Sequence, residues 1–69
     1  GYAAALIEQA GLKGFRLGNA GISGKHAGFA VNLGGATAEE MKQLLQTVSD
    51  RVYETSGIRL EPEIRIWNP

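Results

Sequence analysis

Apolar residues recur at the spacing of an amphipathic helix in two parts of the chain. The first set falls at i, i+3, i+4 and i+7: Ala3, Leu6, Ile7 and Ala10. The second set is longer: Met41, Leu44, Leu45, Val48 and Val52. Each set is followed by a glycine, Gly11 or Gly57, where a helix commonly ends in a left-handed conformation. The pattern therefore predicts a short helix before Gly11 and a long helix before Gly57.

The long helix has a start signal as well as a stop signal. Thr37 is followed three residues later by Glu40, which is the spacing of a capping box. In that motif the threonine hydroxyl accepts the amide of the glutamate, and the glutamate carboxylate reaches back to the threonine amide. We therefore expect this helix to begin at Thr37.

Residues 14–35 carry strand and turn patterns. Glycine recurs too often for a helix between residues 14 and 28, which predicts a short strand, a loop and a second short strand. The residues expected to be buried there are Phe15, Leu17 and Ile22. Residues 29–33 then alternate, with Phe29, Val31 and Leu33 on one side and Ala30 and Asn32 on the other. This alternation predicts a central strand.

The segment after Gly57 also alternates. One side would carry Ile58, Leu60, Ile64 and Ile66, and the other side Arg59, Glu61, Glu63 and Arg65. Pro62 lies within this segment and cannot donate a ladder hydrogen bond, which indicates an edge strand or a bulge. Bulges often re-aim side chains near functional sites. A last strand with one apolar face and one ionic face is therefore predicted.

These elements predict an α+β fold of two layers, in the order helix, two or three strands, helix, strand. The strand-helix-strand passage across residues 27–66 would be a crossover between parallel strands. Both helices would lie on one face of a small mixed sheet. The other face, with Glu61, Glu63 and Arg65, would be left to solvent, to a ligand or to a second domain.

Composition adds limits to this picture. With 69 residues the chain is a single domain with a thin core, and it has no cysteine for a disulfide or a thiolate metal site. Seven basic and seven acidic residues balance, so no net field draws the chain to nucleic acid or to an anionic membrane. We expect neither as a partner. The chain starts without methionine on a helical pattern, so we expect a piece of a longer polypeptide.

The stretch GNAGISGKH, residues 18–26, has the glycine content of a phosphate loop but not its spacing. A Walker loop needs GxxxxGK followed by Ser or Thr. Asn19 stands where the first glycine is needed, and His26 follows Lys25. An ordinary turn-rich hairpin is favoured on composition, and ligand contact by its backbone amides is the alternative.

Single polar residues have ordinary interpretations by default. His26 is the only histidine and the chain lacks cysteine, so no metal site is expected. It would be a surface or hydrogen-bonding residue, and Lys13 would be a solvated cation beside a helix end. Glu61, Glu63 and Arg65 would form an exposed ladder of charges that contributes little to stability.

Three blocks of the sequence, read together, resemble one known family. They are LIEQAGLKG at residues 6–14, SGKHAGFAVNLGGATAEE at 23–40 and LEPEIRIW at 60–67. In order and spacing they resemble the C-terminal, substrate-binding domain of UDP-N-acetylenolpyruvoylglucosamine reductase (MurB), over nearly the whole chain. The form KHAGFAVN resembles the class of this family that has the more compact substrate domain.

The resemblance implies part of a cytoplasmic flavoenzyme of bacterial peptidoglycan synthesis. NADPH would reduce FAD, and the flavin would pass a hydride to the enolpyruvyl double bond, giving UDP-N-acetylmuramate. This domain would close over the UDP-sugar substrate, and its partner would be an upstream FAD-binding domain of the same polypeptide. Residues 1–69 alone would be inactive, because in the family the flavin domain and the serine thought to protonate the substrate lie upstream.

The resemblance also implies roles for four residues. Glu63 matches the second glutamate of the family's EPE(V/I)R motif, which faces the substrate beside the flavin, and it would be the catalytic residue. It could donate a proton at neutral pH only if burial or a neighbouring anion raised its pKa. Arg65 would orient Glu63 or the substrate carboxylate. Lys13 resembles a residue that meets the nucleotide, and His26 falls where the family places a polar residue near the substrate.

A second hypothesis, from another class, is a free-standing α+β binding or interaction module without catalysis. The two hypotheses differ in whether an FAD-binding domain is encoded directly upstream of this chain.

Overall fold

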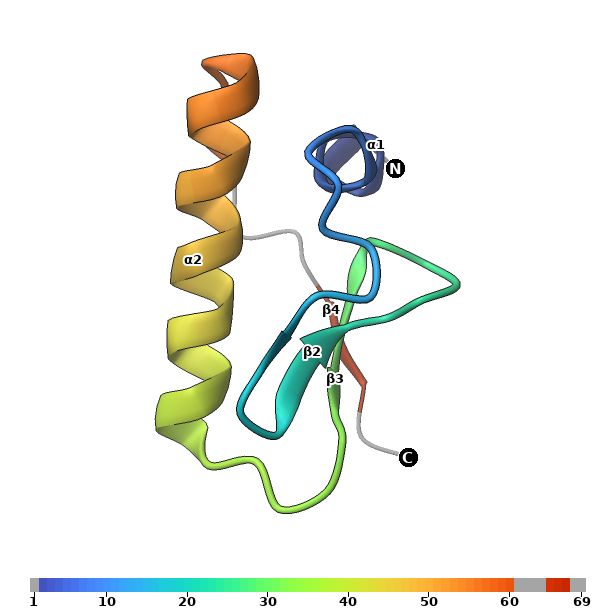
Figure 1. Cartoon of the computed structure of the whole chain (residues 1–69), viewed down its shortest axis with the longest axis vertical. Coiled ribbons are helices and arrows are strands. Elements are labelled where there is room, and N and C mark those ends of the chain that lie inside the picture. Colours follow the sequence, from blue (N-terminus) through green and yellow to red (C-terminus); the bar gives the residue numbers. More distant parts are fainter. Residues whose placement is uncertain (1, 61–64, 68–69) are drawn as a thin grey trace.

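The computed structural model describes residues 2–60 and 65–67, which form two helices and a small sheet (Figure 1). In chain order the elements are α1 (Tyr2–Gln9), β1 (Arg16–Leu17), β2 (Ala20–Ile22), β3 (Phe29–Asn32), α2 (Ala38–Ser56) and β4 (Arg65–Trp67). The strands lie in the order β1-β2-β3-β4, and only the β3–β4 pairing is parallel. The expected α+β class with a mixed sheet is confirmed. Neither described helix combines the length and apolar character that crossing a bilayer requires.

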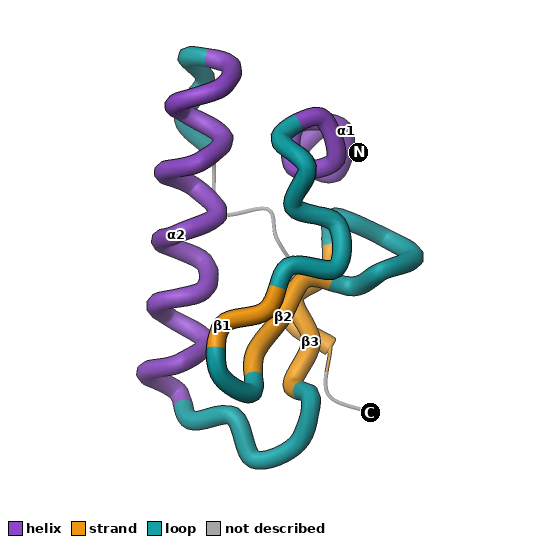
Figure 2. Tube along the Cα trace, viewed as in Figure 1, coloured by secondary structure: helices purple, strands orange, loops and turns teal. Residues whose placement is uncertain are grey.

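One hydrophobic core joins both helices to one face of the sheet. Its buried members from α1, β2, β3 and α2 include Leu6, Ile7, Ala20, Ile22, Ala30, Leu44, Val48 and Val52. α2 runs along β1, β2 and β3, and α1 packs against α2 (Figure 2). Because both helices meet the same set of inward side chains, they cover the same face, as the sequence predicts.

α2 begins and ends at the residues that the sequence predicts. The Thr37 hydroxyl oxygen accepts the backbone N–H of Glu40 at 3.0 Å, and Glu40 Oε1 accepts the Thr37 N–H at 2.9 Å. The capping box is therefore complete. At the other end Gly57 has φ 73°, and its N–H donates to the Tyr53 carbonyl at 2.8 Å. A residue with a Cβ would be strained at that φ, so glycine suits the helix end.

Glu40 also holds the turn between β1 and β2, a contact that no sequence pattern indicates. Its second carboxylate oxygen, Oε2, accepts the backbone N–H of Asn19 at 3.2 Å. Gly18 has φ 61°, and a Cβ added there would collide with Oε2. Hydrogen bonds from the N–H of Thr37 and then of Asn19 lower the pKa of Glu40, and desolvation opposes them.

We expect this carboxylate to make the free energy of unfolding depend on pH. The folded-state pKa of Glu40 lies below its ordinary value of 4.5, so its contribution is fully present above that value. The contribution is lost as the pH falls through the folded-state pKa. In urea unfolding from about pH 7 to about pH 3, wild type should exceed Glu40→Gln in stability at neutral pH, and the difference should shrink with acidification.

Glu39→Gln is the matched control for this measurement. It removes a charge from the same first turn of α2 but leaves both bonds of the capping box in place. Its difference from wild type should change much less over the same pH range. If the difference in the free energy of unfolding from wild type shrank equally for both variants on acidification, the capping box would not be the source of the pH dependence.

The side of the sheet away from the helices is partly apolar. Leu33 Cδ1 lies 3.2 Å from where a Cβ of Gly21 would stand, so the leucine covers this glycine. Val31 pairs with Gly21 across the ladder and is buried, whereas Phe29 is 36% exposed. Ala30, between the two, enters the core. The small residue of β3 therefore faces the helices, and the large residues face outward.

The last strand is shorter than the sequence pattern predicts. Residues 58–60 are not in a strand, β4 begins at Arg65, and residues 61–64 lie outside the described part of the chain. The expectation of a strand from Ile58 onward is wrong at residues 58–60. Arg65 already pairs with Phe29, the first residue of β3, so residues 58–60 lie beyond the end of the partner strand.

Residues 58–60 nevertheless keep the predicted alternation. Ile58 and Leu60 are half-buried and pack against the core. Arg59, between them, is exposed, and its guanidinium lies 4.3 Å from the centre of the Tyr53 ring and 3.8 Å from Asp50 Oδ1. The alternation here reflects an extended segment anchored on α2, not a strand.

Candidate functional site

The loop between β2 and β3, residues 23–28, is held by its own hydrogen bonds. Ser23 Oγ accepts the backbone N–H groups of both Lys25 and His26, each at 3.1 Å. At the base of the loop the Ser23 N–H donates to the Phe29 carbonyl at 2.9 Å. The Phe29 N–H donates to the His26 carbonyl at 3.0 Å. The loop is therefore a defined turn that presents Lys25 and His26 at its end.

An open hollow of about 240 Å³ lies beside this loop. The residues that line it are Ser23, Lys25, His26, Phe29 and Val31. The rings of His26 and Phe29 stand edge to face, with centroids 6.0 Å apart and planes at 69°. The wall is mostly apolar, and the hollow is smaller than the usual pocket for a drug-sized molecule. It suits one part of a ligand rather than a whole one.

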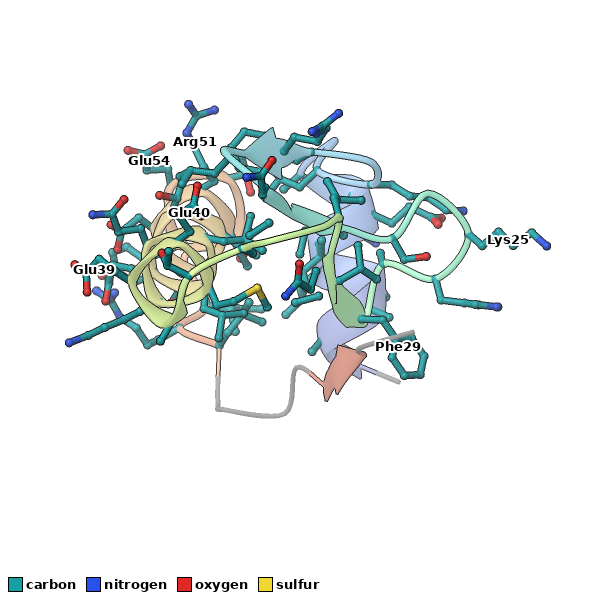
Figure 3. The ribbon with its side chains drawn as sticks, turned by 90° about the horizontal axis from the view of Figure 1, so that it is seen from below. Lys25, Phe29, Glu39, Glu40, Arg51 and Glu54 are labelled. Carbon is teal, nitrogen blue, oxygen red and sulfur yellow. The ribbon has the colours of Figure 1, made fainter. Side chains whose placement is uncertain are left out.

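The charge beside the hollow is basic. Lys25 and His26 are exposed, and none of the described residues that line the hollow carries a carboxylate. Figure 3 shows Lys25 and Phe29 on the side of the molecule away from α2, which carries Glu39 and Glu54. An anionic group at the hollow would therefore meet a neighbouring cation, and no carboxylate among the lining residues that the structure describes.

His26 is one of the described residues that line the hollow, and Lys13 is not. Lys13 follows α1, and its Nζ lies 3.1 Å from Glu8 Oε1. Both side chains of this pair are substantially exposed, at 38% and 61%, so the pair adds little stability. An ammonium group has three donors, and the bond to Glu8 uses one of them.

Arg65 and Glu63, the other two predicted site residues, differ in what the structure describes. Arg65 opens β4, and its backbone position pairs with that of Phe29, a residue of the hollow. Glu63 lies outside the described residues. The parallel strand pair thus brings the Arg65 position beside the hollow, and the catalytic role of Glu63 stays a prediction.

Sequence analysis did not single out Ser23, Phe29 or Val31 as site residues. A signal existed for Ser23, because serine commonly accepts amides two and three residues further along the chain in a turn. No such signal existed for Phe29 and Val31. Alternation shows that two residues share a face, but it does not show which face is covered.

Several backbone amides of the glycine-rich stretch already donate hydrogen bonds within the chain. β1 and β2 pair as the expected hairpin, and ligand contact by the backbone amides stays an untested alternative. The N–H groups of Asn19, Lys25 and His26 donate to side-chain oxygens of the chain itself. The first turn of α2 carries Glu39 and Glu40, whose charge disfavours an anion at that helix N-terminus. These described residues therefore do not fit the diphosphate of a dinucleotide cofactor.

Fold and hollow together define a small α+β domain with a basic, partly aromatic recess beside its sheet. The family model described as UDP-N-acetylenolpyruvoylglucosamine reductase, C-terminal domain, matches residues 1–67. The chain belongs to this family.

Relatives from several bacteria agree with this assignment. The chain is 60% identical over 63 residues to a protein of Caldicellulosiruptor saccharolyticus, a match that covers 91% of the chain and 20% of the relative. It is 47% identical over 66 residues to a protein of Thermosipho melanesiensis, covering 96% of the chain and 23% of the relative. Both are named UDP-N-acetylenolpyruvoylglucosamine reductase. The chain therefore spans about a fifth of the length of these curated relatives.

Proposed function

We propose that this chain is the substrate-closing domain of an FAD-dependent, NADPH-using reductase. The reaction would convert UDP-N-acetylglucosamine enolpyruvate to UDP-N-acetylmuramate in cytoplasmic peptidoglycan synthesis. The supporting observation is the family match over residues 1–67, together with relatives that carry the name of this reductase. Because those relatives are about five times longer, an FAD-binding domain would lie upstream in the same polypeptide. The 69-residue chain by itself should not turn over.

The two parts of the polypeptide would have different roles in the reaction. FAD is assigned to the upstream part, because neither the glycine-rich stretch nor the first turn of α2 offers the set of free backbone amides that binds a dinucleotide diphosphate. Once reduced by NADPH, FAD would supply the hydride. The residues of this chain would bind and orient the substrate and supply a hydrogen bond or proton to it.

Glu63 is assigned the part of donor to the substrate. Hydride addition to an enolpyruvyl group builds negative charge toward the substrate's own carboxylate, and an acid held beside it stabilises that charge. Arg65, two residues further on, would orient Glu63 or the substrate carboxylate. Support comes from the match to the family's motif and from the pairing of Arg65 with Phe29 at the hollow.

Lys13 and His26 are assigned to the nucleotide part of the substrate. Lys13 retains two donors beyond its bond to Glu8, and a compact cation suits a diphosphate. His26 belongs to a hollow whose described lining includes a lysine and no carboxylate. These features favour an anionic ligand with an attached planar or apolar part.

We expect Lys13→Met to weaken substrate binding in the full-length polypeptide. A hydrogen bond to a charged group contributes about 1.5–3 kcal/mol, so KM for the UDP-sugar should rise roughly ten- to a hundredfold, with a smaller change in kcat. Steady-state kinetics at varied substrate measure this. Lys42→Met removes an exposed lysine from α2 and should leave KM unchanged. An unchanged KM in Lys13→Met would remove Lys13 from the site.

The proposed function has a direct spectroscopic test. The full-length polypeptide should purify with bound flavin, NADPH should bleach the flavin absorbance, and the enolpyruvyl substrate should restore it. A polypeptide without flavin, or a reduced flavin that the enolpyruvyl substrate does not reoxidise, would overturn the function.

A further inference from the structure

We propose that Ser23 is the positioning residue of the hollow: its hydroxyl oxygen holds the loop in the shape that presents Lys25 and His26 to the nucleotide part of the substrate. The inference rests on the proposed function, since it requires a UDP-sugar to bind at the hollow. Ser23 would act through its neighbours and not on the reacting atoms.

Both ends of His26 are fixed by the loop's hydrogen bonds. Its N–H donates to Ser23 Oγ at 3.1 Å, and its carbonyl accepts the Phe29 N–H at 3.0 Å. With the backbone fixed, only the imidazole torsions remain, and the ring lies edge-on to Phe29. A loop that is ordered before binding loses less conformational freedom on binding, which raises affinity.

Lys25 is held by the same oxygen atom. Its N–H donates to Ser23 Oγ at 3.1 Å, so one hydroxyl fixes two consecutive residues of the hollow. Ser23 is tied in turn to the sheet, because its own N–H donates to the Phe29 carbonyl. Ser23 therefore links the end of the loop, through its hydroxyl oxygen, to the first residue of β3, through its N–H.

Removal of this hydroxyl should affect binding more than stability. Ser23 is half-buried, and Lys25 and His26 are exposed, so water can reach the two amides once the oxygen is gone. None of the three belongs to the core cluster that holds the helices on the sheet. The loop would loosen while the rest of the domain stays folded.

The first experiment follows the loop in the 69-residue chain by NMR. In Ser23→Ala the amides of Lys25 and His26 should exchange with solvent faster than in wild type. Ser23→Thr keeps the hydroxyl oxygen and should restore slow exchange. Titration with UDP should shift these two amides, and Ser23→Ala should raise the dissociation constant roughly three- to tenfold, the scale of one hydrogen bond.

The second experiment uses the full-length polypeptide. Ser23→Ala should raise KM for the UDP-sugar by a similar factor, with kcat, flavin reduction by NADPH and melting temperature unchanged, and Ser23→Thr should restore KM. A purely structural role would lower the melting temperature and leave KM alone, which would overturn the proposal. Unchanged amide exchange, or faster exchange with unchanged UDP affinity, would overturn it too. A wild-type polypeptide that binds FAD and UDP but never turns over would refute the proposed function alone, and the UDP titration would still decide the role of Ser23.

Discussion

Glu63→Gln in the full-length polypeptide should slow reoxidation of reduced flavin by the enolpyruvyl substrate by about two to four orders of magnitude, the usual range for loss of a general acid. Glutamine keeps the size of the side chain but cannot give up a proton. In the proposed reaction, reduction of the flavin by NADPH would not involve the substrate, so its rate should not change. Stopped-flow measurement of flavin absorbance separates the two half-reactions.

Glu61→Gln provides the matched control, since it makes the same change two residues earlier in the same segment. Its half-reactions should both stay near wild type. If Glu63→Gln reoxidised its flavin at the wild-type rate, Glu63 would have no part in the chemistry. If reoxidation were slow in Glu61→Gln instead, Glu61 and not Glu63 would be the catalytic residue, and the match to the family's motif would be wrong by two residues.

Leu44→Ala should leave the 69-residue chain largely unfolded at room temperature. Leu44 is fully buried on α2 and belongs to the core cluster that joins both helices to the sheet. Leucine-to-alanine changes at such sites lower the free energy of unfolding by about 2–5 kcal/mol. A core of this size supplies only roughly 3–5 kcal/mol in total. Far-UV circular dichroism and urea unfolding would show the loss of helix and of a cooperative transition.

Glu54→Ala lies on the same helix and tests whether the effect comes from burial. Glu54 is exposed and projects outward from α2 (Figure 3). Its urea transition should lie within about 0.5 kcal/mol of wild type. A Leu44→Ala variant that unfolds at the same urea concentration as wild type would show that the core does not depend on α2 in the way described.

The helices were predictable because their signals are local. The apolar spacing, the capping box of Thr37 and Glu40 and the final Gly57 all lie within the element that they define, and each is found where expected. The parallel crossover was predictable for a related reason. A strand, a long helix and a strand in succession leave few ways to rejoin one sheet, and β3 and β4 do so.

Features that depend on residues far apart in the sequence were not predictable. Nothing near Asn19 indicates that its N–H will meet the carboxylate of Glu40. The end of a strand is also set by its partner, so alternation at Ile58 and Leu60 overextended the last strand. An alternation with a period of two residues determines which residues share a face of a strand, but it does not determine what covers that face.

The residues of the candidate site were predicted mainly from the resemblance to a family. The default interpretation of His26 as a surface residue fits its exposure, yet the structure places it in the wall of a hollow. That hollow forms from the β2–β3 loop together with two outward residues of β3, Phe29 and Val31. Its existence depends on how the loop folds back on the strand, which composition and spacing do not determine.

The β3–β4 pairing described above has a consequence for the order of folding. The hairpins between β1, β2 and β3 close over short turns, whereas β4 joins β3 only after the long stretch from residue 33 to residue 64 has been looped back. Because the long stretch must be closed before the pairing is gained, this join is expected to be a slow step of folding. Glu63 comes just before β4 in the sequence, so the proposed chemistry would depend on a strand pairing that is expected to form late in folding.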